Sequence, residues 1–597
     1  MAELDPAVIK ALRKTSSGLK EHESRLKGYD RSYDIWRAST PVTGAEPWQS
    51  KLRMKYAMQV IDTALVNIVS GKPRIMVKPR REQDELAAKK MQNLLDYYVG
   101  EDHLVESQAP FVQQGLIYGV TVAKNHWLYK EAMRPVKTYA HNPLDPSTPL
   151  ENVQQEKLVV RDGPTFEPWN IYDCYWDPGA RDVDSAAYVV LRTYVSKDDL
   201  LQLQFNPQTG QGIYHNVDAL IATGEAPRPQ VTSQNRALGL SGNRFKDKFL
   251  IEEIWSDDEL LVVGNRQVLL RRQPNPYWHG RKPIVIAQTR PDLFEMVGVP
   301  TTELMDHVQQ ALWTVQNMRM DNLHLTVQRG ITYREGGVTD PDLLELRPRF
   351  KWPVTDHDDI RPFEVQPLPP EAYGEENALL SRAQLITGIN PYVSGSDMST
   401  VDQNTATGVT ALQEVASRLL RFQAAQIQYK GVQRSFEMWG DMAQQFLDKA
   451  VSVQVFGPDG KVFWDEVTPE NVIGHFAYKI EGSEESLSRQ QERGEAVALL
   501  NAFAPLLASP GTGINIKPIL ERVALAYDFP NPEALFAPPP QGPPAAPSPD
   551  QVNYNIRGAQ LGPGARFGAN NSLQQGGVTI DPRLENALAT LPQFGQR

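Results

Sequence analysis

Apolar side chains recur with the spacing of an α-helix along the first part of the chain. Within residues 54–68 they fall on one side of the expected helix, and Gly71 and Pro73 follow where that helix should end. The members of this apolar face are Met54, Met58, Ile61, Leu65 and Ile68. Together with neighbouring segments, this pattern predicts a helical layer over residues 1–130.

The pattern becomes that of β-strands between about residues 158 and 286. Residues 187–195 are rich in Val and Tyr, which favour strands. Residues 261–270 contain Gly264-Asn265, a two-residue signal for a hairpin turn. We therefore expect a β-rich lobe after the helical layer.

Two helices with an insertion between them are predicted next. Pro300 opens the first, which continues to about Gln328, and the helical pattern resumes over residues 371–386. The apolar face of the first helix is expected to consist of Leu304, Val308, Ala311, Leu312, Val315 and Met318. Seven prolines in residues 330–370 prevent a long helix there, so the sequence predicts a two-helix stalk that carries a compact knob.

A polar loop over residues 388–404 leads into the longest predicted helix, residues 405–448. At about 1.5 Å per residue this helix would span roughly 66 Å, whereas a compact globule of this size has a radius of gyration of about 25 Å. We therefore expect an elongated subunit, unless Gly431 or Gly440 bends the helix.

The pattern after this helix is more varied. Residues 451–467 are predicted to form a hairpin that turns at residues 457–460, and residues 484–527 to form further helices. Residues 531–597 are rich in Pro, Gly and Gln and offer little apolar surface for a core. A flexible tail is therefore expected there.

The composition is that of a globular protein, with 41% apolar and 9% aromatic residues. No stretch approaches the ~20 apolar residues of a membrane-spanning helix, and the first residues lack the apolar core of a secretory signal. Cys174 is the only cysteine, which excludes internal disulfide bonds. The net charge of −11 argues against tight binding of nucleic acid, although residues 1–90 carry a net charge of +7.

Common enzyme signatures are absent from the sequence. It contains no glycine-rich phosphate loop ending in Gly-Lys-Ser/Thr, no His-Glu-x-x-His, no Cys-x-x-Cys and no Gly-x-Ser-x-Gly. Two groups of aspartates are candidate cation ligands, namely Asp177, Asp182 and Asp184, and Asp356, Asp358 and Asp359. The first group surrounds a Pro-Gly turn, where Asp is an ordinary turn residue, so a structural role is favoured. His307 and His324 on the first stalk helix are likewise expected to be packing or surface residues.

Three segments, taken in order, resemble the portal protein family, particularly the larger portals of short-tailed phages. The segments are Pro-Trp-Asn-Ile-Tyr at 168–172 continuing to 189, Asn-Pro-Tyr-Trp-His-Gly-Arg-Lys-Pro at 275–283, and Thr-Gly-Ile-Asn-Pro-Tyr at 387–392 with Asn-Thr-Ala-Thr-Gly-Val at 404–409. The resemblance covers roughly residues 30–530. The Pro-rich tail departs from it, because some relatives carry a helical barrel there that this composition would not support.

The resemblance implies an α+β fold, mainly helical, in an elongated subunit with wing, stem, clip and crown around a ring axis. The implied parts are a wing at 1–297, stem helices at 298–328 and 371–388, a clip at 329–370, a tunnel loop at 389–404, a long helix at 405–450, a β return to the wing at 451–483, crown helices at 484–530 and the tail at 531–597.

The resemblance also implies a function. Portals form a dodecameric ring at one capsid vertex, through which double-stranded DNA is packaged and ejected, and they are not enzymes. The expected partners are the terminase large subunit, a head–tail adaptor, the major capsid and scaffolding proteins and DNA, with no membrane and no cofactor. The expected location is the portal vertex of the virion, with assembly in the host cytoplasm.

Two sets of residues are expected to serve this function. The channel loop would contain Tyr392, Ser394, Gly395, Asp397, Met398, Asp402, Gln403 and Asn404, and the clip would offer Arg334, Arg347, Arg349 and Lys351 to the motor or the adaptor. An acidic protein suits a conduit, because a DNA duplex that slides through a channel cannot be held by many phosphate contacts.

Two alternatives stay open: a metal-dependent nucleic-acid hydrolase that uses the aspartates, and a virion structural or adaptor protein without a channel.

Overall fold

The structure is a computed structural model, and the residues that it describes all lie in a unit formed by Met1–Leu535. They are residues 5–40, 46–69, 74–140, 150–205, 212–225, 232–233, 247–327, 330–335, 355–363, 365–366, 368–369, 371–389, 418–456 and 462–481. The predicted crown helices and the predicted tail therefore lie outside the described residues.

Helices dominate the N-terminal part. They are α1 (Pro6–Arg37), α2 (Tyr56–Val69), α3 (Glu85–Glu101) and α4 (Leu104–Tyr118). Asp5 caps α1 by accepting from the amide of Ala7 at 2.8 Å, and Pro6 stands at its first position, where no amide hydrogen is needed. In α2 the predicted Ile61 and Ile68 are buried, whereas Met54 precedes the helix and is half exposed.

The prediction that residues 1–130 are all helical is wrong in two places. Strand β1 (Arg74–Pro79) lies between α2 and α3, and strand β2 (Val120–Ala140) begins directly after α4. The change at β2 has a local cause, because Gly119 adopts a φ of +78° that ends α4, and the β-branched run Val-Thr-Val follows.

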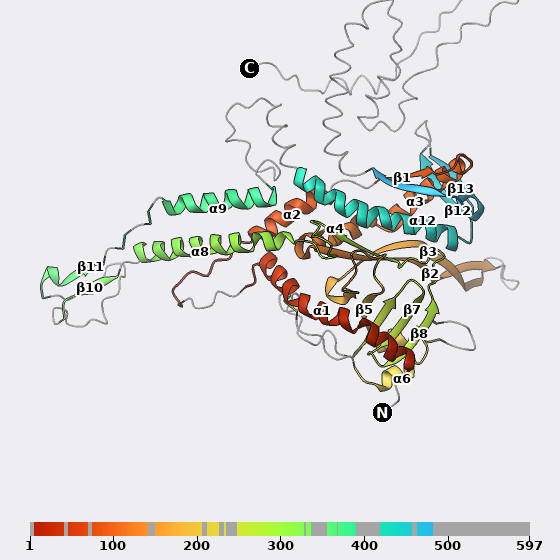
Figure 1. Ribbon diagram of the computed structural model, residues 1–597, viewed down its shortest axis with the longest axis horizontal. Coiled ribbons are helices and arrows are strands. Elements are labelled where there is room, and N and C mark those ends of the chain that lie inside the picture. Colours follow the sequence, from red (N-terminus) through yellow and green to blue (C-terminus); the bar gives the residue numbers. More distant parts are fainter. Residues whose placement is uncertain are drawn as a thin grey trace, which may run out of the picture. The chain divides into compact units, whose positions relative to one another are not determined.

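Two antiparallel sheets in the described chain have more than two strands, and three further pairs of strands stand apart from them (Figure 1). One has the order β3-β2-β9, with β3 (Leu150–Trp169) and β9 (Ile284–Gln288) on either side of β2. The other has the order β4-β5-β6-β7-β8, formed by β4 (Cys174–Trp176), β5 (Val189–Ser196), β6 (Lys248–Trp255), β7 (Glu259–Gly264) and β8 (Val268–Pro274). The short helices α5 (Lys197–Gln202) and α6 (Val217–Ala222) follow β5 in the sequence.

The hairpin between β7 and β8 turns one residue later than the sequence predicts. Asn265 and Arg266 take the two positions with positive φ, at +45° and +58°, as a type I′ turn requires. Gly264 is instead the last residue of β7, where an added Cβ would lie 2.7 Å from Leu220. The Asn265 side chain fixes the turn by accepting from the amide of Leu250 at 3.0 Å and donating to the carbonyl of Gly224 at 2.8 Å.

The long helix is described from residue 418 and is not regular. Residues 418–427 are α-helical, Gln428–Gln433 form a π-helical turn, and α12 (Arg434–Phe446) completes it. The π turn contains Gly431, one of the two glycines expected to bend the helix, and a Cβ there would lie 2.8 Å from the ring of Phe111. The predicted start of this helix, residues 405–417, lies outside the described residues.

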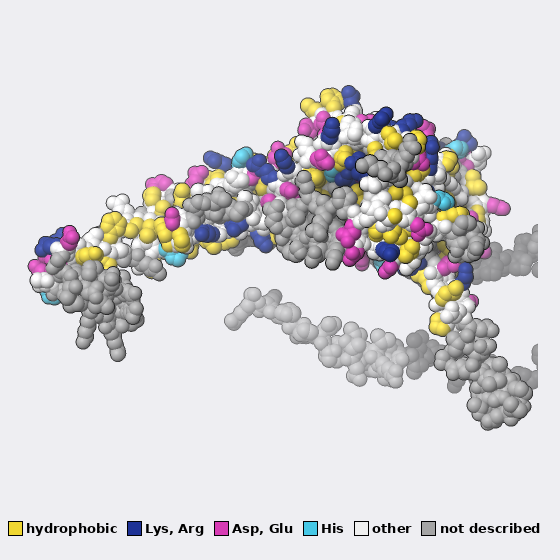
Figure 2. Space-filling model, turned by 90° about the horizontal axis from the view of Figure 1, so that it is seen from below, with side chains coloured by type: hydrophobic (Ala, Val, Ile, Leu, Met, Phe, Trp, Pro, Cys, Tyr) yellow, Lys and Arg dark blue, Asp and Glu magenta, His cyan; other side chains and the backbone are white. Residues whose placement is uncertain are grey.

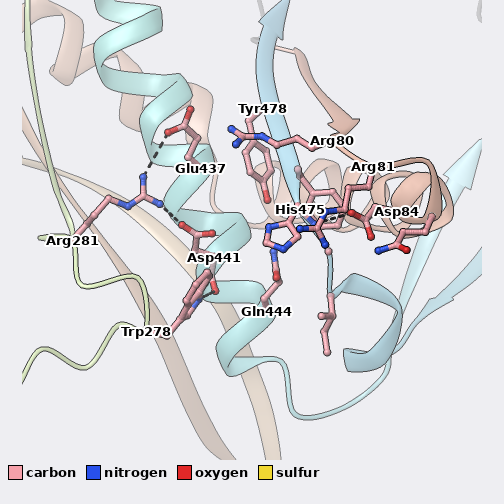
Figure 3. Close-up of a pocket in the computed structure, with 14 residues that line it drawn as sticks. Arg80, Arg81, Asp84, Trp278, Arg281, Glu437, Asp441, Gln444, His475 and Tyr478 are labelled. Carbon is pink, nitrogen blue, oxygen red and sulfur yellow. Dashed lines mark hydrogen bonds and ion pairs between the residues drawn. The ribbon is translucent and has the colours of Figure 1, made fainter.

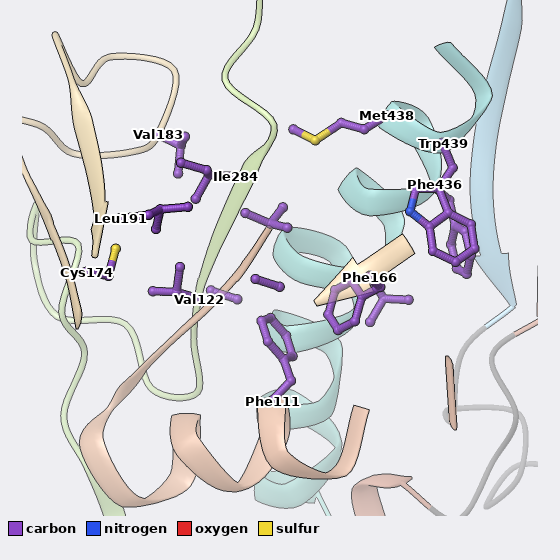
Figure 4. Close-up of a cluster of buried hydrophobic side chains, with 14 of the residues drawn as sticks. Phe111, Val122, Phe166, Cys174, Val183, Leu191, Ile284, Phe436, Met438 and Trp439 are labelled. Atoms are coloured by element: carbon purple, nitrogen blue, oxygen red, sulfur yellow. The ribbon is translucent and has the colours of Figure 1, made fainter. Parts of the chain in front are cut away.

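The buried core joins α4, β2, β3 and α12 (Figure 4). Phe111 and Phe166 pack edge to face with ring centroids 5.1 Å apart, and Phe436 packs in the same way on Trp439 at 5.5 Å. Asn125 of β2 crosses this core: it accepts from Trp439 Nε1 at 3.0 Å and donates to Ser435 Oγ at 3.1 Å. Its buried amide is therefore paired, and α12 is held in one position across the sheet.

The last described segments return to the N-terminal part. β12 (Val451–Phe456) and β13 (Val462–Val467) form the predicted hairpin, whose turn lies outside the described residues. β14 (Phe476–Glu481) pairs antiparallel with β1, so segments about 400 residues apart share one small sheet. With extensive helices and strands in separate runs, the described chain belongs to the α+β class.

His22 of α1 makes this fold sensitive to acid. Its Nε2 lies 2.9 Å from the carbonyl oxygen of Tyr172, and burial lowers its pKa from 6.5 to about 4, with Arg192 and Arg25 adding to the effect. The folded state thus binds this proton less readily than the unfolded state, so the contribution to stability is present above pH 6.5 and is lost as the pH falls toward 4.

We predict that His22→Gln, which keeps a donor but cannot titrate, flattens the acid dependence of stability. For the unsubstituted protein, His22 alone should lower the free energy of unfolding by up to about 3 kcal/mol between pH 7 and 4. Denaturant unfolding at a series of pH values measures this, with the exposed His307→Gln as control. Equal acid sensitivity in both variants would contradict the assignment, although burial also lowers the pKa of His126 and His279 to about 4, so some dependence should remain.

Candidate functional site

Two helices packed side by side lead from the lobe to a small β-structure (Figure 1). They are α8 (Thr301–Val327) and α9 (Glu371–Thr387), with β10 (Ile331–Tyr333) and β11 (Ile360–Pro362) paired antiparallel between them in the sequence. Arg319 of α8 forms an ion pair with Glu376 of α9, and Glu376 also accepts from Gln316 at 3.0 Å. The predicted order of helix, insertion and helix is therefore present.

A row of polar side chains, four residues apart on α8, holds the helix to residues 50–57. Gln309 accepts from the amide of Ala57 at 2.7 Å, and Trp313 Nε1 donates to the carbonyl of Met54 at 2.7 Å. The row continues with Asn317, which bonds both backbone groups of Leu52, and Asp321, which accepts from the amide of Ser50. We name these four residues the polar row.

Gln309 bonds backbone groups at the ends of two helices. Its amide nitrogen donates to the carbonyl of Ile35 at 2.8 Å, in the last turn of α1, while its oxygen accepts from the first turn of α2. Terminal amides of a helix lack partners within the helix, so this buried side chain caps the start of α2. At the end of α1 it is a second donor to a carbonyl that also accepts from the amide of Ala38 at 3.2 Å.

The predicted apolar face of α8 is only partly confirmed, because Val308 packs against a buried cluster that contains Met305 but most of the predicted members are incompletely covered. Of its members only Leu312 is buried, and Met318 is 62% exposed, whereas Gln309 and Gln316 are buried. The reason is that α8 docks through hydrogen bonds to backbone as well as through Met305 and Leu312, and apolar side chains cannot make those bonds. Apolar side chains consequently remain exposed along the pair, among charged ones (Figure 2): Met318, Leu323, Leu325, Val327, Tyr373 and Leu385.

The base of the helix pair is a close junction of backbones. The amide of Gly298 donates to the carbonyl of Gly119 at 3.3 Å, and a Cβ on Gly119 would lie 2.1 Å from the carbonyl oxygen of Gly298. Arg290 reaches from this junction to the carbonyl of Thr387, at 3.5 Å. With the amide of Gln423 turned to present its oxygen, that oxygen accepts from Arg290 Nε at 2.6 Å and Nη2 at 3.0 Å.

At the other end of the pair, the second aspartate group stabilises a turn. Asp356 and Asp359 form a capping box around the 3₁₀ turn His357–Asp359, with the Asp356 amide donating to Asp359 at 2.8 Å. Asp359 also pairs with Arg334 at 3.2 Å, while the Arg334 side chain stays 69% exposed. Of the expected clip residues, Arg347, Arg349 and Lys351 lie outside the described residues.

The first aspartate group is likewise structural. Asp177 accepts from the amides of Gly179 and Ala187, each at 3.3 Å, and Asp182 accepts from the amide of Ser185 at 2.7 Å. Asp184 forms an ion pair with Arg434. Within the described ranges, no three His, Cys, Asp or Glu side chains are placed to hold a metal ion.

His307 and His324 are exposed on α8, and the expected residues of the channel loop, 392–404, lie outside the described residues.

A cavity of about 550 Å³ lies between the turn before α3, the segment before β9, α12 and the start of β14 (Figure 3). Arg281 pairs there with Asp441 and, at 3.8 Å, with Glu437, and Asp84 accepts from the amide of His475 at 3.3 Å. Burial raises the pKa of Asp441, an effect that Arg281 opposes. Asp441 and Glu437 thus pair with a guanidinium, and Asp84 bonds a backbone amide. These contacts are typical of a structural role for the acids that line the cavity.

A signal for the polar row was present in the sequence. Gln309, Trp313, Asn317 and Asp321 recur every four residues, which places them on one helix face. Polar residues at that spacing are also typical of a solvated face, and the backbone groups that they bind come from residues 252 to 271 positions earlier. Only the folded structure brings the two together.

Comparison with known families identifies the class of protein. A family model described as phage SU10 portal protein matches residues 57–561, which is well over half of the chain. The protein is thus a phage portal, and the chain belongs to the phage SU10 portal protein family. This confirms the resemblance to portals of short-tailed phages. No curated protein sequence matches the chain.

Membership of this family gives the function. Portal proteins are structural proteins that form an oligomeric ring at a capsid vertex, provide a channel for DNA, and serve as a docking platform. In the described part of the chain, no helix is long and apolar enough to cross a membrane.

We predict that Gln309→Leu destabilises the attachment of α8 to α1 and α2. The substitution leaves the buried amide of Ala57 without its partner and removes one of the two donors to the carbonyl of Ile35, which keeps the amide of Ala38. The expected cost is about 1–3 kcal/mol. Denaturant unfolding measures the loss, and Gln59→Leu, an exposed glutamine of α2, is the matched control. Equal stability of the two variants would show that the polar row does not hold the helix.

Proposed function

We propose that twelve copies of this chain close the portal ring, with the α8–α9 pair as the stem around the axis. The family match over residues 57–561 supports this proposal above all. The second support is the pair itself, because the exposed side chains of Met318, Leu323, Leu325 and Leu385 can be covered by α8 and α9 of a neighbouring copy. In the same scheme β10 and β11 belong to the clip, α12 to the long helix, and α1–α4, the two larger sheets and β12–β14 to the wing.

The segment between Ile389 and Arg418 is proposed to supply the channel loop. Its residues from Tyr392 to Asn404 include several small polar side chains, and between them stand Asp397 and Asp402 but no Lys or Arg. An acidic loop repels phosphate only within a Debye length of about 8 Å at physiological salt, so it would centre passing DNA without holding it. The junction at Arg290 supports this proposal, since that side chain bonds elements on both sides of the segment.

The clip is proposed to dock the terminase large subunit during packaging and the head–tail adaptor afterwards. Arg334 supports this in part: its guanidinium pairs with Asp359 yet remains exposed and can also meet an acidic partner. Arg347, Arg349 and Lys351 would extend the same basic surface. Major capsid and scaffolding proteins are proposed as partners of the assembled ring in the host cytoplasm, before it becomes part of the virion vertex.

Native mass measurement of the purified chain tests the ring. We expect a closed assembly of twelve subunits, each of 67.0 kDa, over a wide range of protein concentration and salt. The apolar side chains left exposed on α8 and α9 supply the driving force. A strictly monomeric particle under all of these conditions would overturn the proposed ring.

Replacing residues 394–402 with a Gly-Ser sequence of equal length tests the loop. Rings should form normally, because the flanking helices carry the packing, whereas DNA packaging or retention should fall. Electron microscopy counts the rings and nuclease protection measures the packaged DNA. Wild-type packaging and retention by such rings would reduce the loop to a connector.

A further inference from the structure

Strands β2 and β3 continue far beyond the sheet to which they belong. β9 pairs with β2 only from Val120 to Lys124, whereas β2 and β3 remain paired as far as Ala140 and Leu150. Figure 1 shows the two strands running on together past the rest of the sheet. We name the paired residues 129–140 and 150–162 the ribbon.

The base of the ribbon is firmly held. Trp127 Nε1 donates to Asp162 at 2.7 Å, Arg161 pairs with the buried Asp102, and Gly163 lies so close to Tyr98 that an added Cβ would be 2.8 Å from its ring. The direction in which the ribbon leaves the lobe is therefore fixed by side-chain contacts.

Beyond this base the ribbon exposes apolar side chains on both of its faces. Glu131 stands opposite Val159, Ala132 opposite Leu158 and Met133 opposite Lys157, so Met133 and Val159 share one face and Leu158 lies on the other. Tyr129, Met133, Leu158, Val159 and Val160 are between 41% and 58% exposed. A two-stranded hairpin is at best marginally stable alone in water, so a ribbon of this kind needs a covering surface.

Charge argues against DNA as that surface. The described side chains of the ribbon include four basic and three acidic residues, of which Lys157 and Glu131 pair with each other at 3.4 Å. Nucleic-acid contacts require an excess of Lys and Arg. A nearly neutral ribbon with exposed apolar side chains instead suits contact between subunits that each carry a net charge of −11, because it adds little repulsion.

Length points to a neighbouring copy. The part of β2 in the ribbon, residues 129–140, is roughly 40 Å long at about 3.3 Å per residue, well over the radius of gyration of about 25 Å expected for a subunit of this size. In a ring every subunit has another beside it, and each contact joins two different surfaces. We propose that the ribbon is an arm that packs across the adjacent copy of this chain and ties the ring together. This proposal rests on the proposed ring.

Site-directed photocrosslinking tests the arm. Cys174 is buried, so a cysteine introduced on the surface is the reactive one for a benzophenone maleimide. Met133→Cys and Leu158→Cys place the probe on the two faces of the ribbon, and Asp198→Cys on the exposed surface of α5 is the control. In isolated rings we expect covalent dimers and longer ladders from both ribbon sites, with the cross-linked peptides belonging to this chain, and at most a tenth of that yield from the control.

Intact rings that give no chain-to-chain cross-links from either ribbon site would overturn the proposal, as would cross-links in assembled heads that lead only to other virion proteins. Absence of rings in the native mass measurement would instead overturn the proposed ring itself, so the two failures are distinguishable.

Shortening the ribbon, by replacing residues 131–160 with Asn-Gly to join Lys130 to Arg161, gives a second measurement. The protein concentration at half assembly should then rise at least about tenfold, as expected for a contact that carries binding energy. An unchanged concentration would also overturn the arm.

Discussion

The polar row on α8 is the interaction on which the arrangement of the described chain depends. Gln309, Trp313, Asn317 and Asp321 bind backbone groups of residues 50–57, and Gln309 also binds the end of α1. Hydrogen bonds fix direction and register, which apolar contacts alone leave less defined. As a result α8 leaves the lobe along one line, and α9 and the β10–β11 pair follow it.

Glycine at two positions makes this arrangement sterically possible. The start of β2 and the segment before α8 approach so closely at Gly119 and Gly298 that neither could carry a side chain without displacing a carbonyl. Arg290 then joins the same junction to the end of α9 and to residues 418–427. The lobe, the helix pair and the long helix therefore meet at this junction.

Apolar side chains in the second half of α8, from Met318 to Val327, remain exposed, and the ribbon exposes apolar side chains as well. In a monomeric protein such exposure would favour aggregation, whereas in the proposed ring it would supply contacts between subunits. The aspartates that first suggested a cation site, in contrast, already have partners within the subunit. Asp177, Asp182, Asp356 and Asp359 are each engaged by nearby amides or by an arginine, so their clustering reflects turn formation.

The sequence by itself determined the class of protein and much of the secondary structure. The two helices around a Pro-rich insertion, strand β5, the β12–β13 hairpin and the glycine in the irregular long helix could all be predicted, because periodicity and turn residues are local properties. The order of three short segments indicated the family that the comparison confirms. Local signals also led to errors, as when the pattern of residues 1–130 concealed β1, β2 and the long ribbon.

Only the tertiary structure decided which face of α8 is buried and what the polar residues do. An apolar helix face is predicted to be buried in the core. Gln309 and Gln316 are buried although they are polar, because they bond backbone and side-chain groups that are distant in sequence. The same holds for the turn at Asn265-Arg266, where packing of Gly264 against Leu220 moved the bend by one residue. The spacing of residues along the chain predicts which side chains share a face of a helix. Which segment packs on that face depends on contacts between parts of the chain that are far apart in sequence.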